Sequence, residues 1–318
     1  MKRVIKWTGV AIPVLLIAGI AFVVIGSYVE HRQLVEEEEN TYPAPGTLVD
    51  MDDGVSSLHV SAEGTGKGTL VFMAGFGTSS PYYDFRALVE QFTDEYRVAV
   101  VERAGYGWSD ISSRSRDIET VLEETRLALE RSGEAPPYVL FPHSMAGIEA
   151  IHWANTYPEE VLTVIGLDPL VPEYHLQTEE SPSLSRPLTF LARSGLMRNQ
   201  PNVCRDNVAA IRAGHLSDEQ AEIACTLFFR RTFTQDMWNE ADALAGNAEL
   251  VAAQDRSAVA FHAFISGEGE ELWVDVLTAH AEKRSGTSFV LDAGHYIHLD
   301  KPEQIAAESR PLIEAAEF

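Results

Sequence analysis

Positive charge is scarce in this sequence. Its 318 residues carry 24 Lys and Arg against 48 Asp and Glu, which gives a formal net charge of −24 at pH 7. Because such an acidic surface repels the phosphate backbone, DNA and RNA are excluded as expected partners. Tandem repeats are also absent, and the stretch GFGTSS (75–80) does not fit the G-x-G-x-x-G pattern of dinucleotide binding.

Cysteine is nearly absent. Cys204 and Cys225 are the two present, too few for a disulfide scaffold or a zinc cluster. They could form one disulfide if the domain lies outside the cytoplasm, where disulfides persist. The sequence leaves that pairing open.

Charge is missing altogether from Trp7 to Val29. A helix of this length, at about 1.5 Å per residue, crosses the roughly 30 Å hydrocarbon core of a bilayer. Lys2, Arg3 and Lys6 precede the run and acidic residues follow it. The positive-inside rule therefore predicts a single-pass anchor in the cell membrane, with the rest of the chain on the extracytoplasmic side. A cleaved signal peptide, which would release a secreted protein, is the alternative.

Beyond the anchor, short apolar runs alternate with helical patterns. This alternation predicts an α/β fold with a mostly parallel, doubly wound sheet and helices on both faces. The carboxyl ends of the strands then lie along one edge, where such sheets carry their sites. The buried runs are TLVFMAG (69–75), RVAVVERAG (97–105), YVLFPHS (138–144) and VLTVIGLDP (161–169).

From about residue 172 to residue 257 the pattern is helical, without a convincing strand. We interpret this segment as a helical cap inserted into the sheet domain. The predicted organisation is an anchor with an acidic tether (1–45), an N-terminal part of the core (46–171), the cap (172–257) and a C-terminal part of the core (258–318).

Ser144 stands in the stretch PHSMAG (142–147), between a predicted strand and a predicted helix. A sharp turn there can present the serine Oγ at the strand end, and its crowding explains the small neighbours of the G-x-S-x-G motif. This stretch departs from the motif at Pro142 and Ala146. Proline also removes a main-chain donor from a presumed central strand. A serine that merely caps a helix would show the same pattern. Whether Ser144 is a nucleophile therefore depends on finding a base and an acid elsewhere in the sequence.

A base for Ser144 is expected at His295, which follows the strand pattern of GTSFVLDAGH (286–295). Imidazole suits this role because its pKa lies near neutrality. His298 is a rival, three residues further on and nearer the final helix.

A carboxylate must orient the imidazole. Asp168, at the end of the strand before the cap, gives the order Ser-Asp-His. Glu268 and Glu270 follow the next strand and are the alternatives. Main-chain N–H groups are also needed to hold an oxyanion, and those of Phe76 and Met145 are the candidates.

Taken together and in this order, these motifs resemble the α/β-hydrolase family, over about residues 45–318 apart from the cap. The matching stretches are AGFGTSSPYYDF, ERAGYGWSD, PHSMAG, LDPLVPEY and AGHYIHLDKPEQI; the second matches the family signature D-R-x-G-x-G-x-S with Glu102 in place of Asp. The resemblance implies no metal and no cofactor. It further implies a nucleophile at Ser144, a base at His295, an acid at Asp168 and an oxyanion hole from the Phe76 and Met145 amides.

The function expected from the resemblance is a serine hydrolase that acts by acyl transfer on a small-molecule substrate, with a carboxylic ester as the leading class. Hydrolysis of amides or peptides, thioesters or carbon–carbon bonds stays open on the same triad. Serine at the nucleophile position argues against epoxide hydrolase and haloalkane dehalogenase chemistry, which needs a carboxylate there. A non-catalytic ligand-binding protein on this fold is the alternative from another class.

Overall fold

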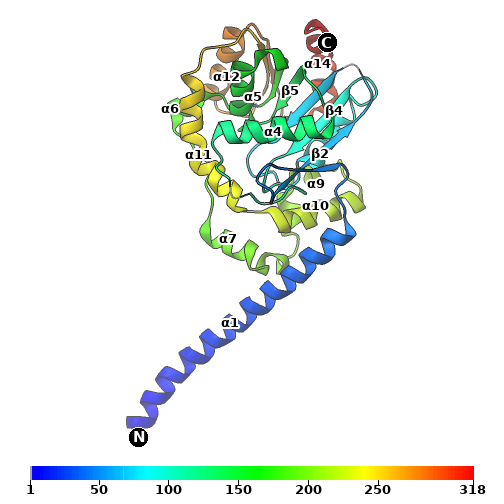
Figure 1. Ribbon diagram of the computed structural model, residues 1–318. Helices are drawn as coiled ribbons and strands as arrows, with labels where there is room; N and C mark the ends of the chain where they lie inside the picture. Colours follow the sequence, from blue (N-terminus) through cyan, green and yellow to red (C-terminus); the bar gives the residue numbers. More distant parts are fainter. Residues whose placement is uncertain (1, 67, 113) are drawn as a thin grey trace.

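The sheet forms the centre of the domain (Figure 1). The computed structural model describes residues 2–66, 68–112 and 114–318, with the main chain alone for residues 2–11. Within these residues eight strands pair in the order β1-β2-β4-β3-β5-β6-β7-β8. The strands are β1 (Thr47–Asp50), β2 (Ser57–Glu63), β3 (Thr69–Met73), β4 (Arg97–Glu102), β5 (Tyr138–Pro142), β6 (Val161–Leu167), β7 (Ala260–Ser266) and β8 (Ser288–Leu291).

Strand direction confirms the predicted sheet. β1 and β2 pair antiparallel, as do β2 and β4. The neighbours from β4 through β3 and β5 to β8 pair in parallel. The carboxyl ends of β5, β6 and β7 therefore meet at one edge.

Both faces of the sheet are buried, because successive side chains of a strand point to opposite faces. Val71 and Met73 of β3 belong to one apolar cluster, and Leu70 and Phe72 belong to the other. Helices α4 (Ile118–Ser132), α5 (Ala146–Thr156) and α12 (Glu271–Lys283) pack on the first face; α3 (Arg86–Val89) and α14 (Pro302–Ala315) pack on the second. The short helices α2 (Pro81–Asp84), η1 (Pro158–Glu160) and α13 (Ile297–Asp300) lie in the connections.

The segment between β6 and β7 is helical in the described structure. A disulfide joins Cys204 to Cys225 there, which settles the pairing that the sequence leaves open. The helices are α6 (Pro172–Thr178), α7 (Arg186–Arg193), η2 (Leu196–Asn199), α8 (Val203–Asn207), α9 (Ala209–Ala213), α10 (Asp218–Arg231) and α11 (Gln235–Ala252).

Helix α1 (Lys2–Thr41) projects from the domain (Figure 1). From Ile12 onward it is long and apolar enough to cross a membrane, with an 18-residue window of mean hydropathy 2.5 that is not buried at all. It is thus a candidate transmembrane helix. The side chains of Lys2, Arg3 and Lys6, on which the predicted orientation depends, lie outside the described part.

The acidic segment that follows the apolar run, predicted to be a solvated tether, instead continues α1. Two of its glutamates pair with arginines between β6 and β7: Glu38 with Arg198 at 2.7 Å and Glu39 with Arg230 at 2.8 Å. These partners lie about 160 and 190 residues away in sequence, so a local pattern gives no sign of them.

Candidate active site

Ser144 occupies the sharp turn between β5 and α5. Its φ of 52° lies in the left-handed region, which is unfavourable for a residue with a side chain. The turn is held by hydrogen bonds from the Ser144 N–H to the Leu167 carbonyl (3.3 Å) and from the Leu170 N–H to the Ser144 carbonyl (2.7 Å). Small residues are required around it, because a Cβ added at Gly147 would lie 2.3 Å from the Leu170 oxygen.

Pro142 does not interrupt the central strand. It ends β5 in register with Met73. The two amides that follow continue the ladder on opposite sides, with His143 donating to the Met73 carbonyl at 2.9 Å and Ser144 donating to the Leu167 carbonyl. The missing donor is therefore tolerated at this position.

Ser144, His295 and Asp168 form one hydrogen-bonded chain. The Ser144 Oγ lies 2.9 Å from Nε2 of His295, and Nδ1 of His295 lies 2.6 Å from Oδ2 of Asp168. The Asp168 side chain is 2% exposed, whereas that of His295 is 44% exposed. The imidazole can therefore reach solvent or a substrate on one side while a buried carboxylate holds its other side.

The second oxygen of Asp168 is also fixed. Its Oδ1 accepts hydrogen bonds from the Ser266 N–H (2.8 Å) and from the Trp273 Nε1–H (2.7 Å). The Asp168 φ of 48° lies in the left-handed region, directly after the last residue of β6. Trp273 lies 105 residues from Asp168 and stands in no motif that points to this contact.

The residues considered as alternative acid or base do not join this chain of hydrogen bonds. Glu268 and Glu270 line the same surface pocket as Asp168 and His295, but Nδ1 of His295 is hydrogen-bonded to Asp168 and to neither glutamate. His298 is fully buried, and its Nε2 lies 3.0 Å from Oδ2 of Asp84.

The two amides expected to hold an oxyanion lie next to the serine turn. Gly75 adjoins it so closely that an added Cβ would lie 2.7 Å from the Ser144 Cβ. Among the hydrogen bonds between described residues, none uses the N–H of Phe76 or of Met145, which leaves both donors for a ligand. The next amide, that of Gly77, donates to the Tyr106 hydroxyl at 3.3 Å.

A buried network links residues 74–77, the expected oxyanion loop, to helix α11. Arg103 donates to the Ala74 carbonyl at 2.6 Å and to Glu240 of α11 at 3.0 Å. The Tyr106 hydroxyl, whose pKa is raised by burial, donates to the same Glu240 carboxylate at 2.5 Å. Glu240 therefore contacts both residues that hold the two ends of the loop. Arg103 and Tyr106 lie in the signature stretch ERAGYGWSD, but no role is assigned to them or to Glu240 from the sequence.

Glu102, which replaces the Asp of the family signature, holds the loop after β4 in place through hydrogen bonds. Its buried carboxylate accepts from the Trp108 N–H (2.7 Å) and the Tyr82 N–H (3.1 Å), and it lies 2.9 Å from Nδ1 of His59. Gly107 packs directly on it, because a Cβ there would overlap the carboxyl group. These contacts fold the loop after β4.

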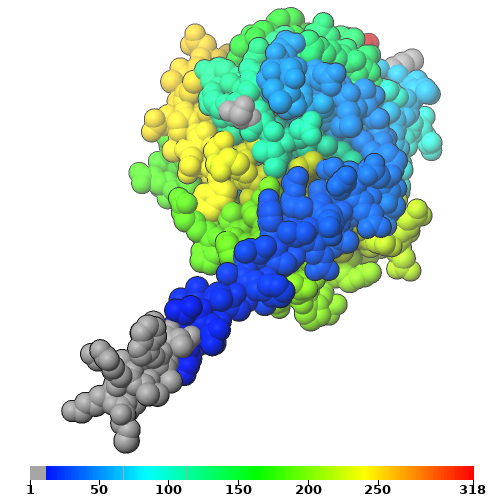
Figure 2. Space-filling view, turned by 60° about the horizontal axis from the view of Figure 1, so that its bottom comes forward, coloured from blue at the N-terminus to red at the C-terminus, as the bar shows by residue number. Residues whose placement is uncertain are grey.

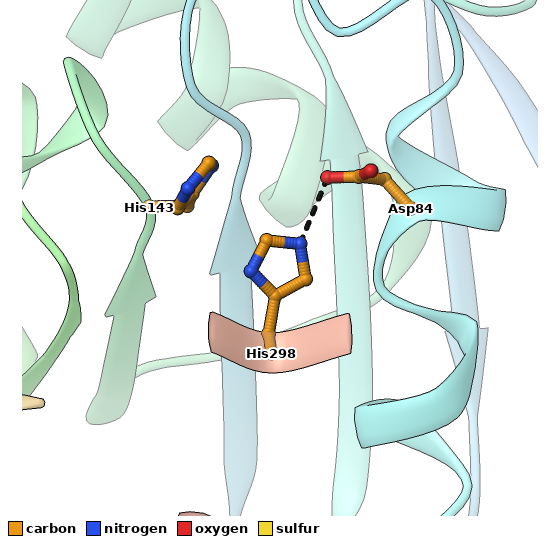
Figure 3. Close-up of side chains that lie close together, drawn as sticks. All are labelled: Asp84, His143 and His298. Atoms are coloured by element: carbon orange, nitrogen blue, oxygen red, sulfur yellow. Dashed lines mark hydrogen bonds and ion pairs between the residues drawn. The ribbon is translucent and has the colours of Figure 1, made fainter. Parts of the chain in front are cut away.

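A buried cluster of Asp84, His143 and His298 lies beside the site (Figure 3). The potential ligand atoms lie within 4.8 Å of one another. However, the two imidazole rings meet edge to face, with centroids 4.6 Å apart, and His143 turns the face of its ring toward His298 (Figure 3). Nε2 of His143 is already hydrogen-bonded to the His295 carbonyl and Nε2 of His298 lies 3.0 Å from Asp84, so these contacts account for the packing of the three groups.

Comparison with known proteins identifies the family to which the fold and the site geometry point. The model of the "Alpha/beta hydrolase family" matches residues 70–308. The uncharacterized protein YbdG of Bacillus subtilis (strain 168) is 38% identical over 228 residues, which cover 71% of this chain and 69% of that protein.

Two solved structures are similar over most of the chain. A putative lipase (lip1) from Acinetobacter baumannii AYE aligns with a TM-score of 0.63 at 15% identity, covering 90% of this chain and 96% of that one. Epoxide hydrolase VrEH1 from Vigna radiata aligns with a TM-score of 0.61 at 17% identity, covering 85% and 97%. At these identities the likeness concerns the fold.

Proposed function

The chain belongs to the alpha/beta hydrolase family and is a hydrolase; from that premise we propose that it is a serine hydrolase that cleaves carboxylic esters by acyl transfer. The observation that carries the proposal is the chain of hydrogen bonds from Ser144 through His295 to Asp168. The left-handed turn at Ser144 adds support, because strained backbone of this kind gathers at functional sites.

In the proposed reaction, Nε2 of His295 takes the Ser144 proton as Oγ attacks the acyl carbon. The Phe76 and Met145 amides hold the resulting oxyanion. His295 then gives the proton to the alcohol oxygen as the ester C–O bond breaks, which leaves an acyl-enzyme. Water attacks this intermediate with His295 again as base, and the acid is released with Ser144 restored.

Asp168 is proposed to accept the Nδ1–H of His295 and so to hold the imidazole in the tautomer that leaves Nε2 free to take the Ser144 proton. Its buried oxygens and two further donors suit a fixed orienting role. Epoxide opening, as the name of one structural relative suggests, is disfavoured because a carboxylate nucleophile would be needed where Ser144 stands.

We further propose that α1 anchors the enzyme in the cell membrane, with residues 46–318 on the extracytoplasmic side and residues 172–257 acting as the cap over the site. The uncharged run and its exposure support the anchor. The Cys204–Cys225 disulfide supports the extracytoplasmic side, since such bonds are rare in the cytoplasm.

The test is a substrate panel with the full chain: p-nitrophenyl esters of short acyl chains, the matching anilides, thioesters and an aryl epoxide. We expect ester hydrolysis to dominate and Ser144→Ala to lower kcat by about 10³-fold or more. Ester hydrolysis that survives Ser144→Ala would refute the proposal. Tight ester binding without turnover in the unaltered protein would favour a binding protein instead.

A further inference from the structure

Helix α7 exposes an apolar surface. Leu188, Phe190 and Leu191 are 45%, 54% and 37% exposed, although the helix has only eight residues. Phe190 also lines a surface groove together with Ile111 and Trp238. Exposed apolar side chains that gather in one place, rather than singly, mark an interaction surface.

The charge of the segment that carries α7 is opposite to that of the whole chain, although Asp242 of α11 also lines the groove beside Phe190. Residues 181–205 contain four arginines and no Asp, Glu or Lys, in a protein of net charge −24. Arg198 pairs with Glu38 of α1. Arg186 and Arg193 are exposed, and across the described residues no ion pair joins either to a carboxylate. Arg193 donates one hydrogen bond to the Arg230 carbonyl and Arg186 lies over the Trp238 ring, so both keep a charge that no carboxylate neutralises in the described residues.

The position of α7 is fixed relative to α1. Gly195, just after α7, packs against α1 so closely that an added Cβ would lie 2.5 Å from the His31 Cβ and 2.8 Å from the Ser27 oxygen. The uncharged run of α1 ends at Val29, between these two contacts. If α1 spans a bilayer, the end of α7 thus lies at the level of the bilayer surface.

The rest of α7 lies on the same side of the molecule. Figure 1 draws α7 on the side from which α1 leaves the domain. Figure 2 looks toward that side and shows green atoms of the segment between β6 and β7 next to the blue atoms of α1. The helix is only about 12 Å long, so all of it is near the plane in which α1 would leave the membrane.

We propose that α7 lies on the bilayer that α1 spans, with Leu188, Phe190 and Leu191 among the lipid headgroups and Arg186 and Arg193 on anionic ones. Apolar side chains combined with arginines are the composition of helices that bind at membrane surfaces, and anionic lipids attract basic residues near the membrane. A second copy of this acidic chain fits less well, because it would bring like charge together. The proposal rests on the proposed anchor but not on the proposed chemistry.

Site-directed spin labelling of the full chain tests this. The two native cysteines are joined to each other, so single cysteines can be introduced at Phe190, at Phe22 of α1 and at Val290 of β8. Phe22 is 80% exposed and Val290 is 54% exposed, so they serve as an anchor reference and an aqueous reference. Each labelled protein is placed in nanodiscs of phosphatidylcholine with phosphatidylglycerol, and collisions with oxygen and with a water-soluble nickel chelate are compared.

We expect the Phe190 label to show an oxygen-to-nickel collision ratio at least threefold above that of the Val290 label. A Phe190 label as aqueous as Val290, beside a Phe22 label in hydrocarbon, would overturn the proposal while leaving the anchor intact. An aqueous Phe22 label would overturn the anchor and this proposal together, whatever the ester assay shows.

The arginines are tested in the same discs. Arg186→Gln with Arg193→Gln should lower the Phe190 collision ratio toward its value in discs without phosphatidylglycerol. The assigned role of the arginines would be overturned if the Phe190 collision ratio changed neither in the double variant nor on removal of phosphatidylglycerol. Thermal unfolding of the double variant, expected to match the parent, controls for loss of fold.

Discussion

His143 donates its Nε2 proton to the main-chain oxygen of His295, 3.1 Å away. The direction is fixed because a carbonyl only accepts. Burial, followed by the influence of His298 and His295, lowers the pKa of His143 well below its usual range, so this imidazole is neutral. The residue before the proposed nucleophile thereby holds the loop that carries the proposed base, and we assign His143 as a positioning residue.

Removing this bond should slow the reaction without changing substrate binding. His143→Leu loses the donor, whereas His143→Gln keeps an N–H near the position of Nε2. We expect kcat for ester hydrolysis to fall about tenfold in the leucine variant, equivalent to about 1.4 kcal/mol, with KM within twofold of the parent. The glutamine variant should recover most of the loss. Equal losses in both variants would mean that His143 matters only for packing.

Glu240 should couple helix α11 to the oxyanion loop. Glu240→Gln keeps the size of the side chain but weakens its hydrogen bonds with Arg103 and Tyr106, because bonds to a charged group are stronger. We expect kcat to fall about tenfold with little change in KM. Glu249→Gln, on the exposed side of the same helix, is the matched control and should leave both constants unchanged. An increase in KM with kcat intact would contradict this account and point to substrate binding instead.

Asp236, also on α11, should make stability depend on pH. Burial raises the pKa of its carboxyl to about 6, although Arg116 and the Ser112 N–H oppose the shift. The pKa of Asp236 is higher in the folded state than in the unfolded state, so ionisation of this carboxyl lowers the free energy of unfolding. The loss is complete above pH 6 and disappears as the pH falls toward 4. The stability of Asp236→Asn relative to the parent should therefore increase as the pH rises, because asparagine does not ionise.

Thermal unfolding at pH 5 and pH 7.5 measures this. The difference in Tm between Asp236→Asn and the parent should shift in favour of the variant by roughly 2–4 °C between the two values, about 1 kcal/mol for a chain of this size. Asp255→Asn, at an exposed aspartate, controls for general charge effects. A difference in Tm that does not change with pH would show that Asp236 has no raised pKa.

Local sequence patterns could predict the sheet and the residues at its strand ends. Apolar runs and glycine turns are local signals, and parallel strands bring their carboxyl ends together. Ser144, Asp168 and His295 could therefore be proposed from sequence as neighbours. The sequence favours Asp168 as the acid but keeps the two glutamates as alternatives, because the contact between Asp168 and His295 joins residues 127 positions apart.

The supporting contacts could not be predicted, because they join distant parts of the chain. Trp273 reaches Asp168 across 105 residues and Glu240 reaches Arg103 across 137. Neither Trp273 nor Glu240 belongs to a motif recognised in the sequence. The helical continuation of α1 was missed for the same reason, since Arg198 and Arg230, which hold it, lie far along the chain.

The central claim is that Ser144 is an activated nucleophile, and covalent labelling tests it most directly. The full chain is treated with a fluorophosphonate, and the modified residue is identified by mass spectrometry. The account predicts one adduct, on Ser144, that forms at least 100-fold more slowly in His295→Ala, because the base that removes the Oγ proton is gone. An adduct on another residue, or a folded protein that hydrolyses esters while Ser144 stays unmodified, would contradict it.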